Sequence, residues 1–266
     1  MVDDAANALS GICVLVTRPA HQAQSLCNRI EDLGGRVIRL PVIEIDDPVE
    51  ITAALDTIRR LDDFDIAVFI SGNAVEKGLA MVNTYGQLPK HLKIAAVGKH
   101  TADTLQQHDI HVDIMPQQQF NSEGLLEVED LQQLNNKQIV IFRGEGGREL
   151  LAQSLRQRGA QVEYAEVYRR IRPECDTSEV QQAGLNGVIN IAIVTSNEGL
   201  QNLYDMVGES GRRWLLHTPL AVVSQRNVEL AQKLGFKSSV IAKQASDEGL
   251  VDAVKEWYAI HTSAGK

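Results

Sequence analysis

The 266-residue chain has few cysteines and few aromatic residues, and it has no long apolar segment. Its three cysteines, Cys13, Cys27 and Cys175, form no CxxC pair and no zinc-ligand spacing, which predicts free thiols in a reducing, cytoplasmic setting. The longest apolar runs, such as residues 188–194, are far shorter than the roughly 20 residues that a membrane span needs. The acidic N-terminus has no apolar stretch of signal-peptide length. We therefore expect neither a membrane protein nor a secreted protein.

The chain also has fewer basic than acidic residues: it contains 26 lysines and arginines and 35 aspartates and glutamates, which gives a net charge of −9. This balance argues against general binding to nucleic acid or to an acidic membrane surface. An anionic ligand would need a local positive site. His108 and His111 lie in a polar stretch without HExxH context, so we expect no metal site. With 5% aromatic residues and no dedicated phosphate loop, the chain gives little support to a flavodoxin-like redox module.

Short apolar runs alternate with amphipathic segments along the chain. Residues 12–16 (ICVLV) predict a buried strand, and residues 17–21 predict a turn. Ala23, Leu26, Cys27, Ile30 and Leu33 then recur at helical spacing until Gly34 and Gly35, and a second strand begins at Val37. The chain is therefore built from units of strand, turn and helix.

The same unit recurs later in the chain, 125 residues on (143 minus 18), which predicts a tandem duplication. At this offset Arg18 matches Arg143, Leu26 matches Leu151, Gly34 matches Gly159, and Val37 matches Val162. Three further segments recur in the same order: residues 68–73 match 192–197 at an offset of 124, 95–98 match 221–224 at 126, and 122–125 match 247–250 at 125.

Parallel strands need right-handed crossovers, which the helices supply, so we predict an α/β fold of two doubly wound parallel-sheet lobes. Residues 40–45 and 165–171 are extended and too polar for central strands, and they occupy equivalent places in the repeat. They predict a two-stranded β linker, residues 40–45 and 165–173, with a cleft between the lobes. Lobe 1 is then discontinuous, residues 1–39 and 174–266, and lobe 2 is residues 46–164.

Ligands of open α/β sheets bind beyond the carboxyl ends of the strands, so the turns at those ends are the candidate binding residues. The alternative is that their Ser, Thr and Asn residues are helix caps and that their glycines serve tight turns. Arg18 and Arg143 are candidates to bind carboxylates or, alternatively, to brace their turns. The set is Thr17, Arg18, Pro19, Ser71, Gly72, Asn73, Gly98, Thr101, Arg143, Gly144, Thr195, Ser196, Asn197 and Ser224.

Residues 143–147 (RGEGG) match neither GxGxxG nor the Walker A pattern, which disfavours nucleotide binding. No triad, metal cluster or pair of acids stands out. Tyr168 is a candidate catalytic residue, because its phenol on a polar linker strand can donate a proton as a general acid. The alternative for Tyr168 is packing against a lobe.

Nearly the whole chain, from about residue 12 to about residue 255, resembles the uroporphyrinogen-III synthases in their bacterial form. The segments that carry the resemblance, in order, are 14–19 (VLVTRP), 39–45 (RLPVIEI), 71–75 (SGNAV), 96–102 (AVGKHTA), 143–151 (RGEGGRELL), 166–173 (EVYRRIRP), 194–200 (VTSNEGL) and 222–226 (VVSQR).

The resemblance implies a monomeric, cytoplasmic enzyme of haem biosynthesis with no cofactor and no metal, acting on hydroxymethylbilane, a linear polycarboxylate tetrapyrrole. Water leaves, and the ring closes with its last pyrrole inverted through a spiro intermediate. Tyr168 matches the residue proposed to assist departure of the hydroxyl, Thr101 a substrate-contacting threonine, and Ser71 and Ser196 turn residues of the cleft. Asn227 stands where the family pattern has a hydroxyl, so a role there is doubtful.

The resemblance agrees with the absence of a catalytic constellation. If the electrophile forms easily without an enzyme, the main task is to hold both ends of the substrate in position, and many weak donors can do this. The competing hypothesis is a two-lobed small-anion binding protein that closes on its ligand without chemistry.

Overall fold

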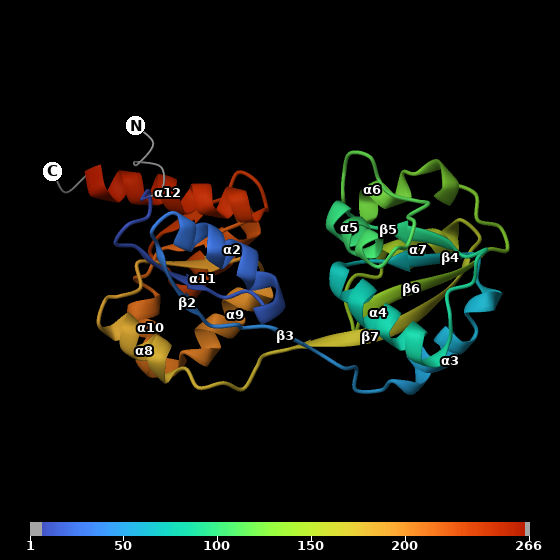
Figure 1. Ribbon diagram of the computed structural model, residues 1–266, viewed down its shortest axis with the longest axis horizontal. Helices are drawn as coiled ribbons and strands as arrows, with labels where there is room; N and C mark the ends of the chain where they lie inside the picture. Colours follow the sequence, from blue (N-terminus) through green and yellow to red (C-terminus); the bar gives the residue numbers. More distant parts are fainter. Residues whose placement is uncertain (1–6, 264–266) are drawn as a thin grey trace. The chain divides into compact units, whose positions relative to one another are not determined.

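A computed structural model describes residues 7–263 (Figure 1). The chain forms two compact units, one made of Met1–Glu44 with Ile171–Lys266 and the other of Ile45–Arg170. The polypeptide therefore passes from one unit to the other twice. We call them the first and the second unit.

The first unit is built on a five-stranded sheet in the order β10-β9-β8-β1-β2, and all of its paired strands are parallel. The central strands are short and fully buried, as their sequences CVLV and IAIV require. The strands are β1 (Cys13–Val16), β2 (Arg36–Arg39), β8 (Ile191–Val194), β9 (Leu220–Val222) and β10 (Ser239–Ile241).

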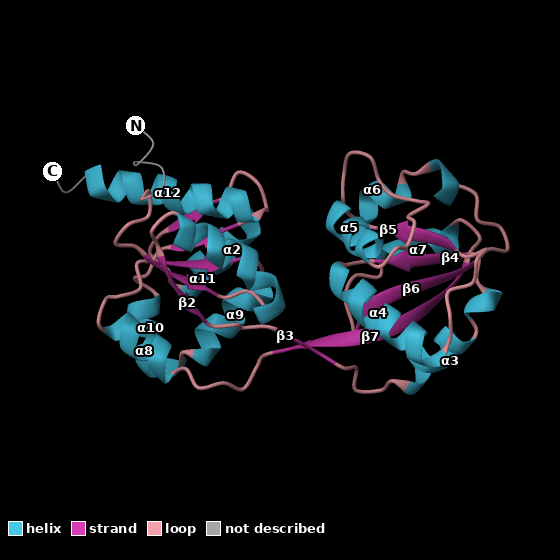
Figure 2. Ribbon diagram, in the orientation of Figure 1, coloured by secondary structure: helices cyan, strands magenta, loops and turns pink. Residues whose placement is uncertain are grey.

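Helices cover both faces of this sheet, and alternate residues of each strand point to opposite faces. Val14 and Val16 pack with α2 and α12, whereas Leu15 packs on the side of α8, α9, α10 and α11. Figures 1 and 2 show these helices around the strands of the unit. The helices are α2 (Ala20–Asp32), α8 (Ser178–Leu185), α9 (Asn197–Met206), α10 (Gly208–Leu215), α11 (Gln225–Leu234) and α12 (Asp247–Ser263).

The second unit repeats this plan on a sheet in the order β3-β7-β6-β4-β5. Its core lies in two clusters, one under α3, α4 and α5 and the other under α6 and α7. The strands are β3 (Glu44–Asp46), β4 (Ile66–Phe69), β5 (Lys93–Ala96), β6 (Gln138–Gly144) and β7 (Gln161–Ile171). The helices are α3 (Thr52–Arg59), α4 (Gly72–Tyr85), α5 (Lys99–Gln107), α6 (Ser122–Leu126) and α7 (Leu150–Gln157), with 3₁₀ turns η1 (Leu61–Asp63) and η2 (Glu129–Leu131).

The predicted fold class is confirmed: the chain forms two α/β units on sheets dominated by parallel strands. One detail of the predicted repeat is wrong by one residue. Ser71 precedes α4 and Ser196 precedes α9, so these turns correspond at an offset of 125 (196 minus 71) rather than 124. Sequence similarity over six residues was too weak to fix the register that the helix caps show.

The linker segments differ from expectation in where they pack. β3 does lie beside β7, and Arg169 Nη2 contacts Asp46 Oδ2 at 2.6 Å. However, residues 165–171 continue β7 as one strand of 11 residues, and Ala165, Val167 and Tyr168 are buried in the core of the second unit. The expected boundary at residue 164 therefore falls inside a strand, because apolar side chains alternate with the charged ones that suggested a linker.

Candidate functional site

Three candidate turns of the first unit follow neighbouring parallel strands, so they share the carboxyl edge of its sheet. Thr17 follows β1, Thr195 follows β8, and Ser224 is two residues beyond β9. The Thr17 hydroxyl is buried and donates to the carbonyl of Ile193 at 2.7 Å. Ser196 and Ser224 cap α9 and α11, while Pro19 stands at the N-cap position of α2 without a side-chain hydrogen bond. Several of these residues thus have structural roles.

Asn227 holds two of these turns together. Its side chain is 4% exposed. Its amide donates to Asn197 Oδ1 at 2.7 Å, and the Ser224 hydroxyl donates to Asn227 Oδ1 at 2.8 Å. Sequence reasoning left Asn227 doubtful because a hydroxyl was expected there. Its side chain links the turn at Ser224 to the turn at Asn197.

The second unit gathers the corresponding turns after β4, β5 and β6, which are also neighbours in the sheet. Ser71 caps α4 by accepting from the Ala74 N–H at 3.2 Å, and Gly98 precedes α5. A Cβ at Gly72 would lie 3.0 Å from His100 Nε2, so the imidazole packs directly against the Ser71–Asn73 turn. Thr101 is buried in the first turn of α5.

Tyr168 is the largest fully buried side chain of the second unit, and 1% of its surface is exposed. Its hydroxyl lies 3.2 Å from the Ser71 hydroxyl. Gly144 packs against its ring, since a Cβ there would lie 2.6 Å from Cε2 and 2.7 Å from Cζ. Glycine at position 144 therefore makes room for the phenolic end of Tyr168.

A β-bulge brings Tyr168 to this place. Arg143 pairs with Glu166 and Gly144 with Tyr168, so β7 has one extra residue, Val167, opposite β6. Strict alternation from Val162 and Tyr164 would put residue 168 on the face covered by α6 and α7. The extra residue turns Tyr168 to the face of α4, where Ser71 lies. Bulges of this kind often re-aim a side chain near an active site.

Both candidate arginines already contact carboxylates of the protein. Arg18 forms an ion pair with Asp247. Arg143 is 3% exposed, and its Nη1 lies 3.0 Å from Glu149 Oε1 while its guanidinium stacks 4.5 Å above the Tyr164 ring. Its Nε donates to the Gly144 carbonyl at 3.2 Å. These contacts favour the bracing role over direct binding of a substrate carboxylate.

The comparisons with known proteins agree with one another. The sequence model of the family described as uroporphyrinogen-III synthase HemD matches residues 24–252, which include parts of both units. The chain belongs to the uroporphyrinogen-III synthase family. Members of this family catalyse a step of tetrapyrrole biosynthesis.

Relatives of the chain carry the same name. The uroporphyrinogen-III synthase of Escherichia coli K12 is 31% identical over 91% of this chain and 99% of its own length. That of Salmonella typhimurium is 32% identical over the same shares. The solved structure of the Helicobacter pylori synthetase covers 92% of this chain and 99% of its own at a TM-score of 0.59 and 18% identity, which shows the shared fold.

In the uroporphyrinogen-III synthase fold of this chain, three side chains with basic groups are exposed at the helix starts that follow β5 and β9. They are Lys99, His100 and Arg226, and none forms an ion pair within residues 7–263. His100 and Arg226 correspond in the repeat at the offset of 126 found for this turn (226 minus 100). All three lie in turns that the sequence predicts as candidates, residues 98–101 and 224–226.

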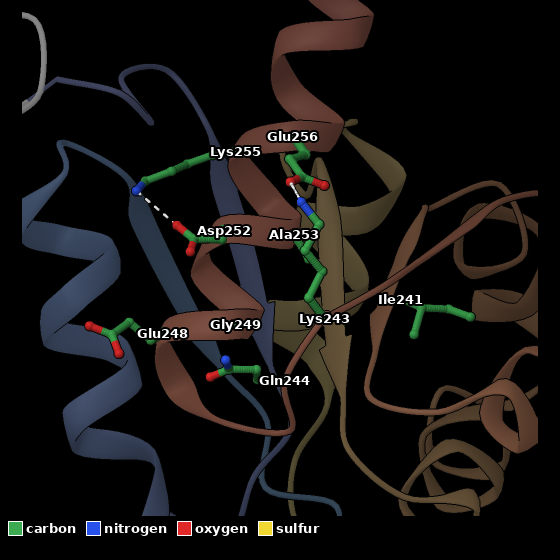
Figure 3. Close-up of a pocket in the computed structure, with 9 residues that line it drawn as sticks. All are labelled: Ile241, Lys243, Gln244, Glu248, Gly249, Asp252, Ala253, Lys255 and Glu256. Atoms are coloured by element: carbon green, nitrogen blue, oxygen red, sulfur yellow. Dashed lines mark hydrogen bonds and ion pairs between the residues drawn. The ribbon is translucent and has the colours of Figure 1, made fainter.

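Two surface hollows have the wrong charge for a polycarboxylate. One, of about 400 Å³, lies beside β10 and α12, and its three acidic residues outnumber two lysines that are already paired with Asp252 and Glu256 (Figure 3). The other, of about 520 Å³, lies at residues 115–130 and is lined by Glu127, Glu129 and Asp130 without a cation. Among the described residues, no group of three metal-binding side chains and no helix suited to cross a membrane is found.

Glu149 is expected to make stability depend on pH. The Tyr164 hydroxyl donates to it and Arg143 lies beside it, and both contacts hold the pKa of Glu149 below its ordinary value. A lowered pKa in the folded state stabilises the protein above the unfolded-state pKa, and that stability is lost as the pH falls through the folded-state pKa. Glu149→Gln should therefore lower the Tm at neutral pH, and the difference should shrink below about pH 4.

Thermal unfolding measured from neutral to acidic pH checks this expectation. Glu123→Gln is the matched control, because Glu123 contacts the exposed Arg148 at 3.5 Å and exposed ion pairs contribute little. A Tm difference for Glu149→Gln that stays constant across the pH range would show that the ionised carboxylate has no such role.

Proposed function

We propose that the protein converts hydroxymethylbilane, a linear polycarboxylate tetrapyrrole, into uroporphyrinogen III as a cofactor-independent lyase. Membership of the family carries this proposal, because the match covers residues 24–252, which include the candidate turns from Ser71 to Ser224. The hydroxyl of the terminal hydroxymethyl group leaves as water after taking up a proton. The substituted carbon of the far pyrrole then attacks to give a spiro intermediate, which fragments, recloses with that pyrrole inverted and loses a proton.

Tyr168 is proposed as the general acid for departure of the hydroxyl. Its ring is held in the core, and its phenolic carbon lies against Gly144, a residue of the carboxyl-edge turn that has no side chain. The phenol is therefore fixed in place directly beneath the backbone of a candidate binding turn. A positioned acid of this kind contributes to the rate by stabilising the transition state for loss of water.

Substrate contacts are proposed for the turns themselves. Thr17, Asn73, Thr101, Thr195, Ser196, Asn197 and Ser224 offer hydroxyl or amide groups, and Gly72, Gly98 and Gly144 offer backbone groups. Lys99 and Arg226 supply positive charge that a polycarboxylate needs in a protein of net charge −9, and His100 offers a ring nitrogen for hydrogen bonding. Arg18, Pro19 and Arg143 shape the same turns.

The test is to add purified protein to freshly generated hydroxymethylbilane in the presence of a chelator and without any cofactor. We expect the type III isomer to predominate, whereas samples without protein give the isomer ratio of spontaneous closure. The spontaneous ratio in both samples would overturn the synthase proposal. Saturable binding without any change of that ratio would favour the small-anion binding protein. The proposal includes a monomer in the cytoplasm, and light scattering of the purified protein measures the oligomeric state.

A further inference from the structure

We propose that Ser71 acts through Tyr168: its hydroxyl donates a hydrogen bond to the phenol oxygen and stabilises the phenolate that forms when Tyr168 gives up its proton. Ser71 is then a positioning residue rather than a substrate contact. This inference rests on the proposed role of Tyr168 as the acid.

The geometry of the two hydroxyls allows either of them to donate, and the proposed direction is the one that leaves the Tyr168 proton available for transfer. A hydroxyl offers one proton and accepts twice. Ser71 Oγ already accepts from the Ala74 N–H at 3.2 Å, and its second contact is the Tyr168 hydroxyl at 3.2 Å. If Ser71 donates to the phenol, both of its contacts are used and Tyr168 keeps its own proton for transfer.

The helix that Ser71 caps favours the same direction. α4 spans 14 residues, and the N-terminus of such a helix carries partial positive charge. Negative charge that develops on the Tyr168 oxygen is therefore stabilised by the Ser71 hydrogen bond and by the helix end behind it. Donors that are already in place where charge develops lower a reaction barrier, because they need no reorganisation at the moment of reaction.

The first unit has a corresponding serine cap that has no tyrosine hydroxyl beside it. Ser196 caps α9 just as Ser71 caps α4, and the residue that corresponds to Tyr168 at the offset of 125 is Ile43. A Cβ at Gly199 would lie 3.1 Å from Ser196 Oγ, 3.4 Å from Val42 Cγ2 and 3.7 Å from Ile43 Cδ1, so apolar side chains lie beside this cap. The serine cap of α9 is therefore formed with apolar neighbours and without a pair of hydroxyls.

The experiment compares Ser71→Asn with Ser71→Asp. The two side chains have nearly the same shape and cap helices about equally well, but only asparagine can donate a hydrogen bond to the phenol. We expect both variants to keep the wild-type Tm within a few degrees. Ser71→Asp should lose about 10- to 100-fold in kcat, whereas Ser71→Asn and Ser71→Thr should keep most of it, and KM should change little in all three.

Two controls complete the set. Ser246→Asn and Ser246→Asp change the cap of α12, where the serine accepts from Gly249 N at 3.1 Å and has no phenol beside it, so their kcat values should be alike.

Tyr168→Phe tests the acid itself. If Tyr168→Phe is slow but Ser71→Asp and Ser71→Asn have equal kcat, the Ser71 inference is wrong and the acid stands. A rise in KM alone would mean that Ser71 contacts substrate, which also overturns the inference. Normal turnover in Tyr168→Phe would remove the acid and the inference together.

Discussion

Tyr168→Phe is expected to lower kcat by about 100-fold, with little change in KM or in thermal stability. The substitution removes the proposed proton donor, so water has to supply the proton for departure of the hydroxyl. The ring stays, and with it the packing against Gly144 and the core of the second unit. The lost hydrogen bond to Ser71 is worth only about 1 kcal/mol in a typical protein. Steady-state kinetics with fresh hydroxymethylbilane, together with thermal unfolding, measure both quantities.

Tyr164→Phe is the matched control, because Tyr164 lies on the same strand and its hydroxyl also forms one hydrogen bond, to Glu149. That phenol contacts the bracing network of Arg143 and is not proposed to meet substrate. We expect its kcat to remain within about twofold of wild type. Equal losses in both variants would point to a shared effect on folding and would leave Tyr168 with a packing role.

The expected fold followed from the sequence because its signals are local. An apolar run of four or five residues predicts a buried parallel strand, and a serine before an amphipathic segment predicts a helix start. The 125-residue repeat then matched Arg18 with Arg143 and Gly34 with Gly159, and both glycines have a positive φ at the ends of their helices. The candidate turns were found for the same reason, since carboxyl-end turns follow directly from the order of strands and helices.

The contacts of the site depend on distant parts of the chain, and the sequence does not reveal them. Arg18 meets Asp247, and Ser71 meets Tyr168, only because folding brings their strands and helices together. The β-bulge at Val167 cannot be predicted from the sequence either. The side chains of residues 165–168 are compatible with a regular strand as well as with a strand that has one extra residue. Sequence reasoning therefore named Tyr168 and Ser71 separately and did not connect them.

Residues 45–170 expressed alone are expected to fold cooperatively, whereas residues 46–164 should not reach a stable fold. The longer fragment contains all of the second unit. The shorter one removes the last residues of β7, among them Ala165, Val167 and Tyr168, which are buried at 0%, 0% and 1% exposure. Burial of one large side chain contributes about 1.5–3 kcal/mol, and a whole domain is stable by about 5–15 kcal/mol. Loss of these side chains therefore removes a large share of the margin.

Urea unfolding followed by circular dichroism measures the free energy of unfolding of both fragments. A third fragment, residues 45–170 with Val167→Ala, should have a free energy of unfolding between those of the other two. A shorter fragment as stable as the longer one would mean that residues 165–170 form a linker after all, as their charged residues suggested. The expected result would show that the second unit requires the part of β7 that carries Tyr168. The position of the Tyr168 hydroxyl would then be lost only when the whole unit unfolds.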